Sequence, residues 1–137
     1  SSEFYKLTYD WEVEDFVVIL PYHSWFSNDT FRLTNCRTGA TIHLQLIRVF
    51  ATDHSIPLCV VGFQPERQQV LLSDGSCWEV PLADRSTFLR WEQGDVVLLG
   101  INDGGLSTYY PNILINPRLD FYDSYHRYLR GCYLGQY

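Results

Sequence analysis

The chain has 137 residues, of which 46% are hydrophobic, 16% aromatic and 19% charged, and its formal net charge is −6. This composition is typical of a globular domain and excludes an intrinsically disordered chain. A membrane-spanning helix needs roughly 20 apolar residues, and the sequence has no apolar stretch near that length, so we predict no membrane insertion. The acidic balance and the scattering of the ten basic residues disfavour nucleic acid and anionic membrane surfaces as partners.

The length predicts one domain, which we place at residues 5–137. We interpret Ser1-Ser2-Glu3-Phe4 as a cloning remnant and leave it out of the fold prediction. The sequence contains no methionine, so we expect the native start of the protein to be missing from it.

Several short segments have the apolar or alternating pattern of β-strands and are separated by turn residues. They are, in chain order, 15–20, 30–35, 40–46, 56–63, 69–73, 77–80, 95–99 and 110–116. Asp74-Gly75 lies between two of them and predicts a β-hairpin, because glycine adopts the positive φ that the turn requires. The sequence therefore predicts a mainly β fold, a small barrel or sandwich of about eight strands.

A C-terminal helix is predicted over about 121–130. Apolar, mostly aromatic residues recur there every three to four positions from Phe121, and the opposite face is polar. Asp120 can cap the start of this helix and Gly131 can end it. We expect the aromatic face to pack on the β core. A second, weaker helical turn is predicted over 83–89.

The sequence also contains a short internal repeat. Residues 11–20 align with residues 91–100, with Trp, Glu, Asp and one Val identical. Each block precedes a long loop and then a Leu-x-Asn strand, at 33–35 and at 114–116. The pattern predicts two related β halves that share a core. These halves would span roughly 8–48 and 68–117.

Trp11 and Trp91 open the two blocks and are candidates for stacking on a ligand. Because the same Trp and acidic residues occur twice, we interpret them as structural corners with the indole in the core. A glycosidase would need two carboxylates facing a cleft. The paired acids of this chain fall in the same structural blocks and are Glu12, Asp15, Glu92 and Asp95.

Four cysteines are scattered along the chain, and no two of them have C-x-x-C spacing. This spacing excludes zinc-ribbon and thioredoxin-type sites. In a domain large enough to bury a core, we expect free thiols rather than a disulfide framework, which favours a cytoplasmic compartment. The cysteines are Cys36, Cys59, Cys77 and Cys132.

The sequence carries no complete catalytic, metal-binding or cofactor motif. It has no G-x-S-x-G elbow, and Asp103-Gly104-Gly105 lacks the lysine and the spacing of a phosphate loop. We therefore predict no catalytic residues, no metal and no cofactor. The alternative is a small hydrolase or metal-dependent enzyme, in which imidazole and carboxylate groups would bind the metal. Its candidate residues are His23, Asp29, Asp53 and His54.

Two long loops, 21–29 and 101–111, occupy equivalent places in the repeat and carry many aromatic residues. Loops above a rigid scaffold often bind partners, and Trp and Tyr are favoured anchors. We predict a non-enzymatic protein-interaction or structural module, or alternatively a carbohydrate-binding module. The other reading of these aromatics is that they fold back and plug the barrel. The predicted contact residues are Tyr22, His23, Trp25, Phe26, Tyr109 and Tyr110.

Overall fold

The computed structural model describes residues 11–12, 14–22, 31–44, 46, 56–119 and 128–137. Within these ranges the chain is mainly β, which confirms the predicted fold class. The strands are β1 Val17–Pro21, β2 Phe31–Asn35, β3 Thr41–Leu44, β4 Leu58–Gln64, β5 Gln69–Leu72, β6 Ser76–Glu79, β7 Val96–Ile101, β8 Asn112–Ile115 and β9 Tyr128–Gln136. The helical segments are η1 Pro65–Arg67, η2 Leu82–Asp84 and α2 Arg85–Phe88, and the last two confirm the weak helical turn predicted over 83–89.

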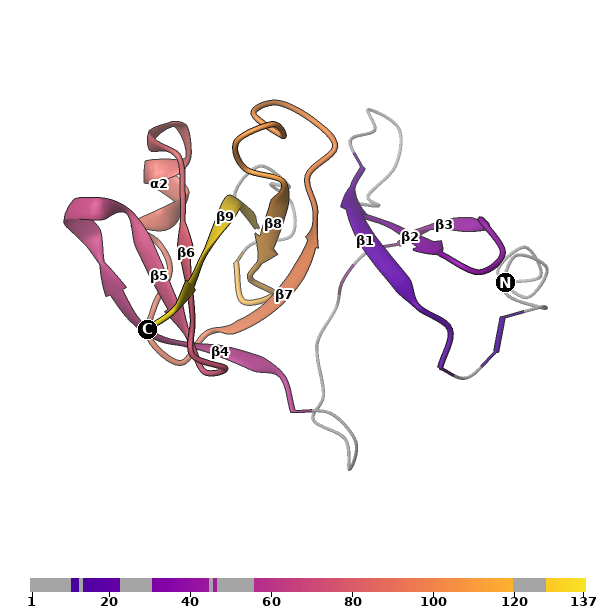
Figure 1. The fold of residues 1–137 in the computed structure, drawn as a ribbon, viewed down its shortest axis with the longest axis horizontal. Coiled ribbons are helices and arrows are strands. Elements are labelled where there is room, and N and C mark those ends of the chain that lie inside the picture. Colours follow the sequence, from indigo (N-terminus) through magenta and orange to yellow (C-terminus); the bar gives the residue numbers. More distant parts are fainter. Residues whose placement is uncertain (1–10, 13, 23–30, 45, 47–55, 120–127) are drawn as a thin grey trace.

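The strands form two antiparallel sheets that lie side by side (Figure 1). Six strands in the order β4-β5-β6-β9-β8-β7 close into a barrel, and β1-β2-β3 form a separate three-stranded sheet. The β5–β6 hairpin turns at Asp74-Gly75, as predicted: Gly75 has a φ of +87°, and the Asp74 carboxylate accepts a 3.0 Å hydrogen bond from the Ser76 N–H.

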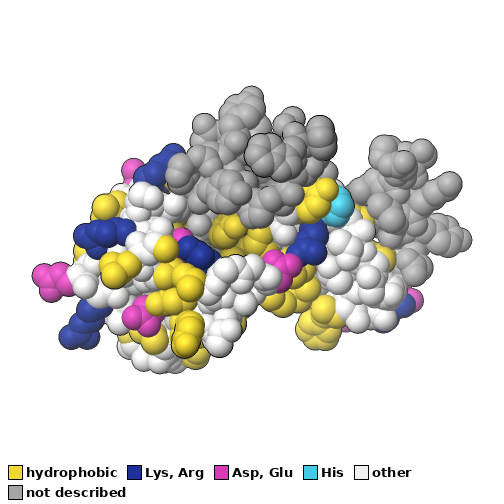
Figure 2. Space-filling view, turned by 90° about the horizontal axis from the view of Figure 1, so that it is seen from above, with side chains coloured by type: hydrophobic (Ala, Val, Ile, Leu, Met, Phe, Trp, Pro, Cys, Tyr) yellow, Lys and Arg dark blue, Asp and Glu magenta, His cyan; other side chains and the backbone are white. Residues whose placement is uncertain are grey.

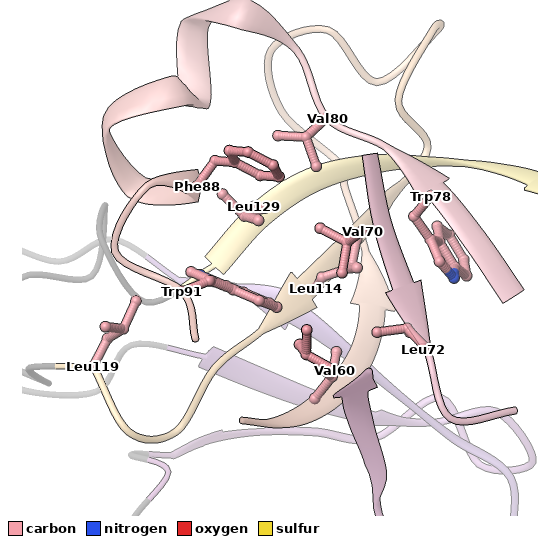
Figure 3. Close-up of a cluster of buried hydrophobic side chains, with 11 residues drawn as sticks. Val60, Val70, Leu72, Trp78, Val80, Phe88, Trp91, Leu114, Leu119 and Leu129 are labelled. Atoms are coloured by element: carbon pink, nitrogen blue, oxygen red, sulfur yellow. The ribbon is translucent and has the colours of Figure 1, made fainter. Parts of the chain in front are cut away.

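The barrel encloses the main hydrophobic core (Figure 3). Its strands follow the two-residue period: in β5, Val70 and Leu72 are fully buried, whereas the residues between and before them are only half-buried. Trp91 and Phe88, from the segment after β6, add large aromatic rings to this core. Trp91 is only 5% exposed, which agrees with the structural role assigned to it.

A second apolar cluster joins the three-stranded sheet to the outside of the barrel. Phe31 from β2 packs with Ile113 and Ile115 from β8, and all three side chains are fully buried. The approach is closest between β1 and β7, where a Cβ on Gly100 would lie 2.5 Å from the carbonyl oxygen of Ile19. Only glycine therefore allows the two strands to come so near each other.

The prediction of a helix over 121–130 is wrong for its last three residues, which begin strand β9; residues 120–127 lie outside the described ranges. Buried Leu129 and Gly131 alternate with half-buried neighbours, as in a strand. Gly131 does not end a helix. It leaves space for a core side chain, since a Cβ there would lie 2.2 Å from Leu114 Cδ1. The aromatic spacing resembled a helical face, but barrel closure decided the local structure.

Asp95 lies at the corner before β7 and binds one group from its own repeated block and two groups from the segment after β8. Its carboxylate accepts hydrogen bonds from the Glu92 N–H at 2.8 Å, Asn116 Nδ2 at 2.7 Å and Arg118 Nε at 2.6 Å. Burial raises the pKa of the Asp95 carboxyl, but these hydrogen bonds outweigh burial and hold the pKa below its usual range. The carboxylate therefore holds together two separate parts of the chain.

Asp15 makes the same set of contacts before β1. Its carboxylate accepts hydrogen bonds from the Glu12 N–H, Asn35 Nδ2 and Arg37 Nε, each at 2.8 Å. The hydrogen bonds from Arg37, and then those from Glu12 and Asn35, hold the pKa of Asp15 well below its usual range. The paired acids thus have structural partners, while a common origin of the two halves stays a prediction.

The strand registers also correspond between the two units. Ile19 faces Leu33, which faces Ile42 across β1-β2-β3. In the barrel, Leu99 faces Leu114, which faces Leu129 across β7-β8-β9.

Within the described ranges, no helix has both the length and the apolar character needed to cross a bilayer.

Candidate functional site

A groove of about 450 Å³ lies between the three-stranded sheet and the barrel. Its volume is within the range of small-molecule sites. Its walls come from the end of β1, from β2, from η2, from the loop between β7 and β8, and from β9. The polar or aromatic side chains that line it include Tyr22, Arg32, Asp84, Asn102, Asp103 and Arg130.

Among the described residues, two arginine–aspartate pairs line this groove. Arg32 of β2 contacts Asp103 of the β7–β8 loop, so this pair joins the sheet to the barrel. Arg130 of β9 binds Asp84 through Nη2–Oδ1 at 2.6 Å and Nε–Oδ2 at 3.1 Å, and this bond raises the pKa of Arg130. The formal charges of the four groups cancel. On the described part of the face in Figure 2, Lys or Arg side chains are interspersed with Asp or Glu side chains.

The two pairs differ in how much water reaches them. The side chains of Arg130 and Asp84 are 23% and 15% exposed, and those of Arg32 and Asp103 are 30% and 43% exposed. Asp84 also accepts a 2.9 Å hydrogen bond from the Arg130 backbone N–H. The Arg130–Asp84 pair therefore forms a fixed wall, whereas the Arg32–Asp103 pair is the one open to a ligand.

The loop between β7 and β8 is held in shape by the buried side chain of Asn102. Its amide donates to the carbonyls of Gly105 at 3.0 Å and Tyr110 at 2.8 Å, and its oxygen accepts the Gly104 N–H at 3.1 Å. Leu106, within this loop, has a φ of +64°. A bulky residue rarely adopts this left-handed conformation, so the hydrogen bonds around Asn102 stabilise a strained loop.

This loop presents two apolar side chains to solvent, Leu106 at 43% exposed and Tyr109 at 73% exposed. We call this pair the crest. The neighbouring Tyr110 is half-buried, and burial raises the pKa of its hydroxyl. Of the two tyrosines predicted here, one is therefore on the surface and the other is partly packed.

The structure places the predicted contact residue Tyr22 in the groove, where its ring stacks on His43 with 3.9 Å between centroids. The two loops predicted to act together thus contribute to one groove, through Tyr22 from the first and Asn102 to Gly105 from the second. The other contacts predicted in the first loop lie outside the described ranges and are His23, Trp25 and Phe26.

Sequence reasoning missed Arg32, Asp84 and Arg130 as groove residues. They come from three separate elements, and Arg130 bonds to Asp84 across 46 positions of sequence. No local motif marks such a group, because only barrel closure brings β9 beside η2. Arg130 instead falls within the segment for which the sequence predicts a helix.

Among the described residues, no cluster of three or more His, Cys, Asp or Glu side chains is placed to bind a metal. The metal-site candidates of the sequence lie outside those ranges and are His23, Asp29, Asp53 and His54. All four cysteines are free thiols, as expected for a domain large enough to bury a core. Burial raises the pKa of Cys77, so this thiol is less reactive than an exposed cysteine.

Comparison with known proteins supplies no relative for this chain. No protein-family model matches the sequence, no curated protein matches it, and no solved structure matches the fold. Function is therefore inferred from the geometry of the groove and the crest alone.

Proposed function

We propose that this domain is a non-enzymatic interaction module that binds a protein partner through the crest, Leu106 and Tyr109. The observation that carries the proposal is a tyrosine that is 73% exposed on a loop whose shape the Asn102 hydrogen bonds hold. Tyrosine is enriched among residues that dominate binding energy, because it brings a large contact area with few rotatable bonds.

The strain in this loop supports the same interpretation. A non-glycine residue held in the left-handed region costs on the order of 1–3 kcal/mol, and such strain clusters at active sites, ligand clamps and switch regions. Leu106 bears that cost although its side chain is 43% exposed. A loop already ordered before binding loses less conformational entropy when a partner docks.

Exposure alone would not distinguish the crest. Leu82 and Ile56 are 77% and 86% exposed, and single exposed apolar residues are normal on a protein surface. What distinguishes the crest is that two apolar side chains project from one loop that a buried amide fixes. Leu82 therefore serves as a matched control for Tyr109, since its side chain is about as exposed as that of Tyr109 but lies on η2.

The test places a photo-crosslinking amino acid at position 109 and, separately, at position 82 in the protein expressed in its source cells. We expect position 109 to capture a discrete partner that position 82 does not. Adding Leu106→Ser should abolish that capture while the melting temperature stays unchanged, because Leu106 is not in the core. Equal capture from both positions would contradict the proposal, as would a large loss of stability in Leu106→Ser.

Carbohydrate binding is the second candidate, and the groove favours it. An aromatic ring, Tyr22, and the charged pair Arg32–Asp103 line the same concave surface. Aromatic faces stack on sugar rings, and carboxylate and guanidinium groups can each bond two hydroxyls at once.

A further inference from the structure

We propose that the groove is a site for neutral saccharides, and that the Arg32–Asp103 pair makes it select them over acidic ones. This inference rests on the carbohydrate-binding candidate and deepens it by naming the ligand class and the residues that select it. The ligand can be a free polysaccharide or a glycan attached to a protein, because both present the same neutral hydroxyl groups.

The first step of the argument is charge. Among the residues that the structure describes, two arginines and two aspartates line the groove, and each arginine contacts one aspartate. An acidic ligand that approached Arg32 would either displace Asp103 or lie beside its like charge, so it gains little net attraction. A neutral ligand leaves both pairs intact, and therefore the groove offers it hydrogen bonds without the cost of an unpaired charge.

The second step is to identify which of the two ion pairs a ligand can reach. The Arg32–Asp103 pair is the more exposed one. Arg130 and Asp84 bind each other through two side-chain contacts, Asp84 also accepts the Arg130 backbone N–H, and Arg130 Nη1 donates to the Gly105 carbonyl at 3.3 Å. Every nitrogen of this guanidinium and both oxygens of this carboxylate thus have a partner within the protein. Arg32 spends its Nε on the carbonyl oxygen of Pro21 at 3.1 Å, and its Nη2 contacts Asp103. Of the two aspartates, Asp103 is therefore the one whose carboxylate can accept hydrogen bonds from the hydroxyl groups of a ligand. The same carboxylate neutralises the charge of Arg32.

The third step is the aromatic wall. Tyr22 stacks nearly parallel on His43, at an interplanar angle of 19°, so its ring is held in one orientation at the edge of the groove. Glycines at 104 and 105 bring the loop backbone to the same groove without side chains. A fixed ring, a bare backbone and paired planar polar groups together suit a flat, hydroxyl-rich ring more closely than a charged ligand.

The experiment is an NMR titration of the whole chain, which follows the amides of Gly104 and Gly105. The probes are the neutral sugars maltohexaose, cellohexaose and chitohexaose, a neutral high-mannose glycopeptide, and the acidic hexagalacturonate. We expect at least one neutral probe to shift these amides and hexagalacturonate to bind more weakly. Binding of the glycopeptide alone would assign the site to protein-linked glycans, and binding of a free hexasaccharide would assign it to polysaccharides.

The matched variants are Asp103→Asn in the groove and Glu66→Gln on η1, which remove the same charge from the chain. Asp103→Asn should weaken the neutral probe about tenfold, as loss of a hydrogen bond to a charged group does. It should also strengthen hexagalacturonate binding, a gain that about 0.5 M salt should reduce. Glu66→Gln should change neither.

The outcomes separate the inference from its premise. If no saccharide shifts the groove amides, both the carbohydrate candidate and the inference fail. If wild-type protein prefers hexagalacturonate, carbohydrate binding stands and the charge selectivity is overturned. If Glu66→Gln acts like Asp103→Asn, the role of Asp103 is overturned. Should Asp103→Asn fail to fold, the wild-type preference between neutral and acidic probes still decides the question.

Discussion

Replacing Asn116 by Ala should destabilise the barrel more than almost any other single polar substitution in the chain. Asn116 is fully buried, donates to Asp95 at 2.7 Å and accepts the Arg118 N–H at 3.1 Å. Alanine removes both bonds and leaves the buried carboxylate of Asp95 with one donor fewer. A hydrogen bond to a charged group contributes about 1.5–3 kcal/mol, and an unsatisfied buried group costs about 1–3 kcal/mol more. We expect a total loss of about 3 kcal/mol.

For a domain of this size, that loss corresponds to a fall of about 10 °C in melting temperature. The measurement is thermal and urea unfolding at pH 7, where Asp95 is ionised. Gln93→Ala, at an exposed position of the same corner, is the control and should change the melting temperature by less than about 2 °C. If Asn116→Ala falls no further than Gln93→Ala, the corner network contributes nothing to global stability and the reasoning is refuted.

Three further predictions concern pH and packing. The pKa of Asp95 is lowered in the folded protein. Its contribution to stability is therefore present above the unfolded pKa of about 3.9 and is lost as the pH falls below that value. When the pH is lowered from 6 to about 3, the urea midpoint of Asp95→Asn should fall less steeply than that of the wild type. Gly131→Ala places a Cβ 2.2 Å from Leu114 Cδ1 and should cost about 1–3 kcal/mol by overpacking, and a double-mutant cycle with Leu114→Val should recover part of that loss. Gly100→Ala forces a Cβ to 2.5 Å from the Ile19 carbonyl, so amide exchange should speed up in β1 before it does in β5; equal protection of β1 in both proteins would count against a close β1–β7 contact.

Much of the fold could be predicted because its signals are local. The alternation of Val70 and Leu72 with half-buried residues and the Asp74-Gly75 turn act over a few residues, and both appeared as expected. The two repeated corners were also visible, since Trp, Glu and Asp are close in sequence. The arginines that complete these corners were not identified, because each lies more than 20 residues beyond its aspartate.

The groove could not be predicted, because its parts meet only after the chain has folded. Tyr22 was identified from its aromatic loop, but its neighbours in space come from β2, η2 and β9. The wrong helix prediction at the start of β9 has the same cause. The aromatic residues from Phe121 onward have a helical period. The segment from Tyr128 is nevertheless a strand, because it pairs with both β6 and β8.

The position of β9 between β6 and β8 has a consequence for how the protein is made. Both neighbours are synthesised before it, so a nascent chain that has reached residue 119 exposes the hydrogen-bonding edges of two strands at once. Open edges of this kind recruit other strands and promote aggregation. The barrel closes only when β9 leaves the ribosome, and a pause in translation between β8 and β9 would therefore lengthen the period in which the chain depends on chaperones.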